Sequence, residues 1–184
     1  MRSMALRPGN HRLGPEQGRI EVRTYREGVA QMAGHDLIID VGEWRGSVQV
    51  REGGELSSLE LQADPRSLQV REGLRGVKPL TDKDRAKIRE EIGAKVLGSQ
   101  QIAFRSTEIE GSDGGLRVRG DLVVAGATRP VGYELEVSSE GRLLGTLPLT
   151  QTEFGIKPYR GFMGALKVRD DVEVVVDIQL PSGA

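Results

Sequence analysis

Apolar and polar residues alternate in almost every segment between Arg19 and Leu180, and this two-residue period constrains the fold more than any other feature. Near the start of this region, Ile20 and Val22 alternate with charged residues. Successive side chains of a β-strand point to opposite faces of its sheet, so the pattern predicts strands with one apolar and one polar face. Strands are expected near residues 19–24, 35–41, 44–50, 59–63, 102–106, 116–124, 131–137, 143–149 and 172–180.

One segment follows a helical period instead. Thr81 and Asp84 have the spacing of a capping box, in which each residue satisfies a free backbone N–H of the other. Ile88, Ile92 and Val96 then recur every four residues, which places them on one face of a helix. The sequence therefore predicts one α-helix over about residues 82–97.

Composition excludes several classes of function. The 26 basic and 27 acidic residues give a formal net charge of -1, which argues against a nucleic-acid surface. Cysteine is absent and only two histidines occur, so neither a thiolate site nor a His-rich metal site is expected, and no cofactor is predicted. No phosphate-binding glycine loop and no nucleophile elbow with a Ser-His-acid set is found. We expect no enzymatic activity.

The length of the chain and the distribution of its apolar residues limit its possible domain organisation. A chain of 184 residues is expected to form one domain with a sizeable core. We expect residues 1–17, which lack periodicity, to be a flexible segment, and residues 18–184 to form a β-barrel domain. Neither a signal-peptide apolar run nor a membrane-spanning segment is found, so a cytoplasmic location is expected.

Strands of this kind favour an all-β fold, an antiparallel closed β-barrel of about eight strands with one helix. Each strand must bury its apolar face, and closing the sheet removes its exposed edges. A barrel of about eight strands either packs solid or holds one small ligand. The expected interior is mainly Val, Leu, Ile and Ala, whose medium size leaves room for a ligand but also packs a solid core.

Several short segments, in this order and spacing, also carry a family resemblance: Gly34–Leu37, Trp44–Val48, Ile102–Thr107, Gly120–Val131 and Thr152–Ile156. Over about residues 19–180 the chain resembles the YceI-like family. The resemblance implies a lipocalin-like barrel that holds a polyisoprenoid or a fatty-acid- or amide-like lipid. It also implies a homodimer.

On this basis we expect the lumen to be lined by inward-facing residues, with Tyr159 and Phe162 in a lip over the opening. The candidates are His35, Leu37, Ile39, Val48, Phe104, Leu122, Val124, Tyr133, Leu135, Phe154, Ile156, Tyr159 and Phe162.

Two alternatives stay open at this stage. In the first, the barrel is solid and acts as an interaction module, in a stress response for example. In the second, the fold holds an enzyme that acts on a lipid-like substrate through His35, the one histidine expected inside the fold. A lone histidine more often has a structural role or contacts a polar head group, because catalysis needs a positioned partner.

Overall fold

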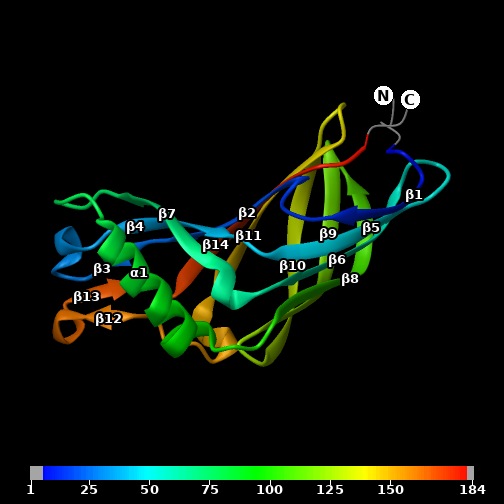
Figure 1. Cartoon of the computed structure of the whole chain (residues 1–184). Helices are drawn as coiled ribbons and strands as arrows, with labels where there is room; N and C mark the ends of the chain where they lie inside the picture. Colours follow the sequence, from blue (N-terminus) through cyan, green and yellow to red (C-terminus); the bar gives the residue numbers. More distant parts are fainter. Residues whose placement is uncertain (1–5, 182–184) are drawn as a thin grey trace.

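An antiparallel sheet of eleven strands curls around one apolar interior (Figure 1). The structure is a computed structural model that describes residues 6–181, apart from the side chains of Lys95 and Phe162. In their hydrogen-bonded order, the strands are β1 (Gly9–Leu13), β5 (Trp44–Val50), β6 (Leu56–Ala63), β8 (Ile102–Ser112), β9 (Gly115–Val124), β10 (Ala127–Val137), β11 (Arg142–Thr150), β14 (Asp171–Gln179), β2 (Gly18–Thr24), β4 (Asp36–Val41) and β7 (Leu68–Leu74).

A second, smaller sheet lies at the end of the molecule farthest from the chain termini (Figure 1). Its strands are β12 (Arg160–Gly161), β13 (Leu166–Val168) and β3 (Arg26–Glu27), in that order. The chain also forms the single helical turns η1 (Gln31–Ala33), η2 (Pro65–Ser67), η4 (Gln151–Phe154) and η5 (Phe162–Gly164).

The curl of the large sheet depends on one bent hairpin. Strand β4 runs into β5 across two residues, and β6 runs into β7 through η2. The first half of this pair, β4 with β7, joins β2, whereas the second half, β5 with β6, joins β1 and β8. At the bend, the N–H of Gly42 donates to the carbonyl of Ser67 at 3.0 Å, and the N–H of Asp64 donates to the carbonyl of Glu43 at 3.0 Å. The hairpin therefore links both arms of the sheet.

The predicted helix is confirmed in position, with a change of pitch in its last turn. It consists of α1 (Asp82–Glu91), which continues as the π-helical stretch η3 (Ile92–Leu97) and ends at Gly98. The capping box forms as expected, because Thr81 Oγ1 accepts from the N–H of Asp84 and the Asp84 carboxylate accepts from the N–H of Thr81. The side chain of Arg89 donates to the carbonyl of Arg66, which holds the helix against the bend.

Three expectations differ from the structure. Residues 9–13, placed in the flexible segment, form β1, an edge strand that pairs with β5 and buries Leu13. Strand β7 was not predicted, because Leu68 and Val70 are buried but the alternation then breaks off. Eleven strands thus form the large sheet instead of about eight, and within residues 6–181 its order runs from β1 to β7 without a ladder that closes it. The all-β class and the antiparallel pairing agree with expectation.

Glu21 on β2 is a nearly buried charge on the outer face of the sheet. Arg71 donates to its carboxylate at 2.7 Å and Arg23 at 3.3 Å. Burial alone would raise the pKa of Glu21, but hydrogen bonds and charge from Arg71 and Arg23 outweigh it, so the pKa of Glu21 lies below its ordinary value of 4.5. The network ties β2 to β7 across β4.

We predict that Glu21→Gln lowers the free energy of unfolding at pH 7 by about 1–3 kcal/mol, because Arg71 loses its ionic partner in a partly buried site. Since the folded-state pKa is depressed, the contribution of Glu21 is fully present above about pH 4.5 and is lost as the pH falls through the folded value. Urea unfolding of both proteins from pH 7 to pH 3 measures this. A difference that is constant over that range would contradict the assignment.

Candidate functional site

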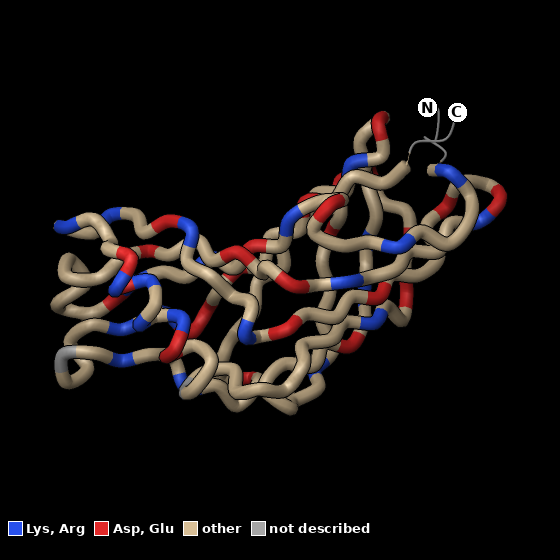
Figure 2. Tube along the Cα trace, viewed as in Figure 1, with Lys and Arg blue, Asp and Glu red and all other residues tan. Residues whose placement is uncertain are grey.

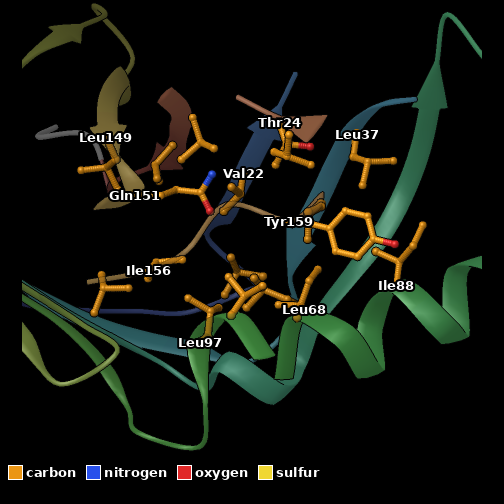
Figure 3. Close-up of a pocket in the computed structure, with 18 of the residues that line it drawn as sticks. Val22, Thr24, Leu37, Leu68, Ile88, Leu97, Leu149, Gln151, Ile156 and Tyr159 are labelled. Atoms are coloured by element: carbon orange, nitrogen blue, oxygen red, sulfur yellow. The ribbon is translucent and has the colours of Figure 1, made fainter. Parts of the chain in front are cut away.

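A cavity of about 640 Å³ occupies the half of the curled sheet that lies beside α1 (Figures 1 and 3). Strand residues from opposite sides of the interior converge on it, and in Figure 3 the side chains of Val22, Leu37 and Leu149 surround the same space. Volumes of about 300–1,000 Å³ are usual for small-molecule sites. The cavity is therefore large enough for a substantial ligand.

The strands of the large sheet supply a wall without charge. On most strands of the large sheet the apolar lining residues follow the two-residue period: Ile20, Val22, Leu37, Ile39, Val41, Ile102, Phe104, Leu122, Val124, Tyr133, Leu147, Leu149, Val172, Val174 and Val176. Strand β6 departs from this period with Leu61, Gln62 and Ala63, and Thr24 on β2 adds a hydroxyl. Apart from these polar groups and the Tyr133 hydroxyl, the wall is a hydrocarbon surface, which a polar ligand group would meet at a desolvation cost. The wall favours a long apolar molecule.

The helix closes the side of the cavity where β7 and β8 are not paired. Its apolar stripe, Ile88, Ile92 and Val96, lies on the cavity wall, and Leu97 completes it. Figure 3 shows Ile88 next to the ring of Tyr159 and Leu97 close to Leu68. The periodicity that predicts the helix thus also marks the face that a ligand would contact.

The cavity ends at a floor formed by Phe104 and Tyr133, whose ring centroids lie 5.7 Å apart at an interplanar angle of 60°. One step farther along the same strand faces, Leu135, Leu143 and Ile178 are 1–2% exposed and do not line the cavity. The half of the interior beyond this floor is solid core.

Tyr133 brings a polar group to the floor. Among the described residues, its hydroxyl makes no hydrogen bond to protein. Burial raises the pKa of Tyr133, so the phenol stays protonated throughout the neutral range. It can therefore donate a hydrogen bond to a ligand, but it does not act as a base.

The opening carries charged side chains, whereas the floor carries only the Tyr133 hydroxyl as a polar group. The charged residues on the cavity wall come from the loops, from α1 and from the small sheet: Arg26, Lys78, Asp84, Lys87, Glu91 and Lys167. The imidazole of His35 lines the same opening. His35 Nε2 lies 2.6 Å from the carbonyl of Lys78, to which it donates when that nitrogen is protonated. The contact joins the loop before β4 to the loop before α1, so His35 helps to shape the opening.

Most of the predicted lining residues lie together on the wall: His35, Leu37, Ile39, Phe104, Leu122, Val124, Tyr133, Phe154, Ile156 and Tyr159. Val48 and Leu135 do not, and these two assignments are corrected. Both face inward, as predicted, but they lie in the solid core with 0% and 2% exposure. Alternation gives the face of a strand, but not the position along the barrel. The side chain of Phe162 lies outside the described part of the chain.

Two parts of the wall are absent from the set of lining residues predicted above. Strand β14 contributes Val172, Val174 and Val176, whose alternation was recognised without a link to the site. The apolar stripe on α1 also lines the cavity, whereas its sequence pattern predicts only that the helix has one apolar face. The signal for both was present in their periodicity, but sequence does not place a helix against a particular opening.

The part of the chain that the structure describes offers neither a metal site nor a membrane-spanning helix. No group of three or more acidic or histidine side chains is placed to hold a metal ion there. No helix in residues 6–181 is long and apolar enough to cross a membrane.

The fold of this chain is similar to that of solved structures. It is similar in structure to BcnA from Burkholderia cenocepacia, with a TM-score of 0.64 and 15% identity over 88% of this chain and 94% of that protein. It is also similar to a YceI protein from Campylobacter jejuni, with a TM-score of 0.53 and 9% identity over 79% and 85% of the two chains. These likenesses concern the fold alone. A comparison with curated proteins gave no match.

Family membership follows from a family model, since the sequence identities to these solved structures are too low to show it. The model for the YceI-like domain matches residues 12–180, which include every strand of the cavity wall and the helix. The chain therefore belongs to the YceI-like family.

Proposed function

We propose that this protein binds, carries or buffers a long apolar lipid, of the polyisoprenoid or fatty-acid and amide class, in its cavity. The observation that carries the proposal is the uncharged strand wall around a cavity of about 640 Å³ that ends on Phe104 and Tyr133. The family is known for polyisoprenoid binding, which agrees with this chemistry.

The driving force would be removal of hydrocarbon from water. Each isoprene unit has five carbons and contributes roughly 3–4 kcal/mol in gross terms, at about 0.8 kcal/mol per buried carbon. Loss of ligand freedom offsets a large part of this gain. Because few directional bonds are needed, we expect the protein to accept several lipids of similar length.

The proposal also covers closure of the barrel, the oligomeric state and the cellular location. We expect the curled sheet to act as a barrel closed along the bent hairpin, since β4 runs into β5 and so links both arms of the sheet. A homodimer, implied by the family, and a cytoplasmic location, expected from the sequence, remain predictions.

The two alternatives are less well supported. A solid interaction module does not account for the cavity. Catalysis through His35 has the difficulty that its Nε2 is engaged with the carbonyl of Lys78, which leaves a structural role as the simpler explanation. The interaction module is tested by the experiment below.

The first experiment is native mass spectrometry of gently purified protein, followed by organic extraction of any adduct. A stoichiometric adduct that is released as a hydrocarbon-rich lipid supports the proposal and identifies the ligand class. An apo mass that persists after addition of polyprenyl alcohol and of oleic acid would overturn it in favour of the interaction module.

We predict that Val174→Trp fills the cavity and lowers the affinity for a polyprenyl alcohol at least about tenfold, since the larger side chain occupies the space of several ligand carbons. The fold should persist, because the cavity accepts the added volume. Displacement of a fluorescent fatty acid measures the affinity. Val175→Trp, at the next residue on β14, is the matched control, because alternation puts this side chain on the outer face. The affinity of this variant for the polyprenyl alcohol should stay unchanged.

We also predict that the ligand enters tail first, because the charged opening can solvate a polar head and the floor cannot. Tyr133→Phe should then change the affinity for a polyprenyl alcohol by less than about twofold, since one lost hydrogen bond would cost roughly a factor of five. Tyr159→Phe at the opening provides the comparison. A loss of tenfold in Tyr133→Phe alone would mean that the head group reaches the floor.

A further inference from the structure

The large hydrophobic side chains that are exposed in the described part of the chain gather at one end of the molecule. They are Val29, Met32, Leu74, Val77, Tyr159 and Met163. Val29 is 96% exposed, Val77 69% and Met32 65%, so these side chains have little packing role in the isolated chain. Scattered exposed apolar residues are usual on a soluble protein, but a grouping at one site marks an interaction surface.

Three neighbouring loops carry these residues, and we call residues 26–35, 74–80 and 157–168 together the rim. The first and third loops are joined by the β3–β13 pairing and by a 2.9 Å hydrogen bond from the N–H of Ala30 to the carbonyl of Ala165. The first and second are joined by the contact of His35 with Lys78. Figure 1 shows the loops side by side around β3, β12 and β13.

The rim is also the basic part of the chain. It contains six basic residues, Arg26, Arg75, Lys78, Lys157, Arg160 and Lys167, and one acidic residue, Glu27, whereas the whole chain has a net charge of -1. The first two turns of α1, next to the rim, add three basic and two acidic residues. Figure 2 shows basic positions on each of the loops at this end. Two of these cations pair with the buried carboxylate of Asp36, Arg26 at 4.0 Å and Arg75 at 3.5 Å, so they are not free to meet a ligand. The exposed apolar side chains are thus interspersed with the four remaining cations, Lys78, Lys157, Arg160 and Lys167.

We propose that the rim docks on the surface of an anionic phospholipid bilayer. Interfacial binding combines apolar side chains that insert among the head groups with Lys and Arg that pair with anionic lipids. A second copy of the chain fits less well, because a two-fold interface would place the same cationic patch against itself. Protein interfaces are also depleted of Lys at their centre.

The rim surrounds the opening of the cavity. Arg26, His35, Lys78, Tyr159 and Lys167 belong both to the rim and to the cavity wall. A bilayer that covers the rim would therefore place its acyl region opposite the opening, and a lipid could pass between bilayer and cavity with little exposure to water. This route rests on the proposed function, whereas the docking surface itself does not.

The test is flotation of the full chain with vesicles of phosphatidylcholine and phosphatidylglycerol in equal parts, against vesicles of phosphatidylcholine alone. We expect binding to the anionic vesicles that weakens as salt screens the charges. Val29→Asp combined with Met163→Asp should lower the partition coefficient by about tenfold or more, since it removes two inserting side chains and adds two negative charges.

The matched control is Gln49→Asp combined with Ser139→Asp, which adds the same charge at exposed positions away from the rim. This variant should float nearly as the unmodified protein does. Fluorescence of Trp44, the only tryptophan, reports whether each variant is folded. Loss of flotation in the rim variant only, with both variants folded, supports the proposal.

The proposal would be overturned if the protein did not bind anionic vesicles, or if both variants lost binding equally. It would also be overturned if sedimentation analysis showed a dimer that the rim substitutions dissociate, while the protein did not bind vesicles. Val174→Trp separates the two proposals. If Val174→Trp still binds vesicles but no longer binds the cavity ligand, docking does not depend on the cavity. If the unmodified protein binds the ligand but not the vesicles, the docking proposal is wrong and the proposed function still stands.

Discussion

The bend in the β4–β5 and β6–β7 hairpin is the constraint on which the rest of the molecule depends. Two backbone hydrogen bonds, from Gly42 to Ser67 and from Asp64 to Glu43, hold the two strands together where both change direction. Asp64 also accepts from the N–H of Arg66, and Ser67 Oγ donates to the carbonyl of Asp64 at 2.7 Å. Because each strand pairs with different neighbours on either side of the bend, the sheet has to curl, and its curl creates an interior.

The same bend decides where the interior is hollow. Beyond it, β7 pairs with β4 only, so the side between β7 and β8 is left to α1 and η3. A helix is wider than a strand and presents one apolar stripe, here Ile88, Ile92 and Val96. On the other side of Phe104 and Tyr133, strands enclose the interior and their side chains meet. The molecule therefore combines a packed half and an open half within one sheet.

Much of this could be predicted from the sequence, and the limits have physical causes. Alternation indicates the face on which Leu37, Leu122 and Val124 lie, and these side chains line the cavity. It did not reveal β1, whose only buried side chain is Leu13, since an edge strand with polar residues leaves no periodic signal. Nor did it separate Leu135 from Tyr133, which share a face of β10 and differ only in depth. Depth depends on long-range pairing, which a local pattern does not contain.

The charge and hydrophobicity of the rim were not recognised in the sequence for a related reason. Val29, Val77 and Met163 lie far apart along the chain and belong to no alternating or helical apolar pattern. Only the contacts between the three loops bring them to one end of the fold. Surface function of this kind is a property of tertiary arrangement.

The floor formed by Phe104 and Tyr133 separates two parts of the molecule that differ in local stability as well as in packing. Leu135, Leu143 and Ile178 beyond it are buried in full, so the strands near the chain termini hold most of the close packing. Opening of the loops and the helix would expose little of that packing, and local opening free energies in proteins fall well below the global value where buried contacts are few. The hollow half can therefore fluctuate while the packed half stays folded. Exchange of a bound molecule would then be limited by motion of the loops and helix, and not by the stability of the protein as a whole.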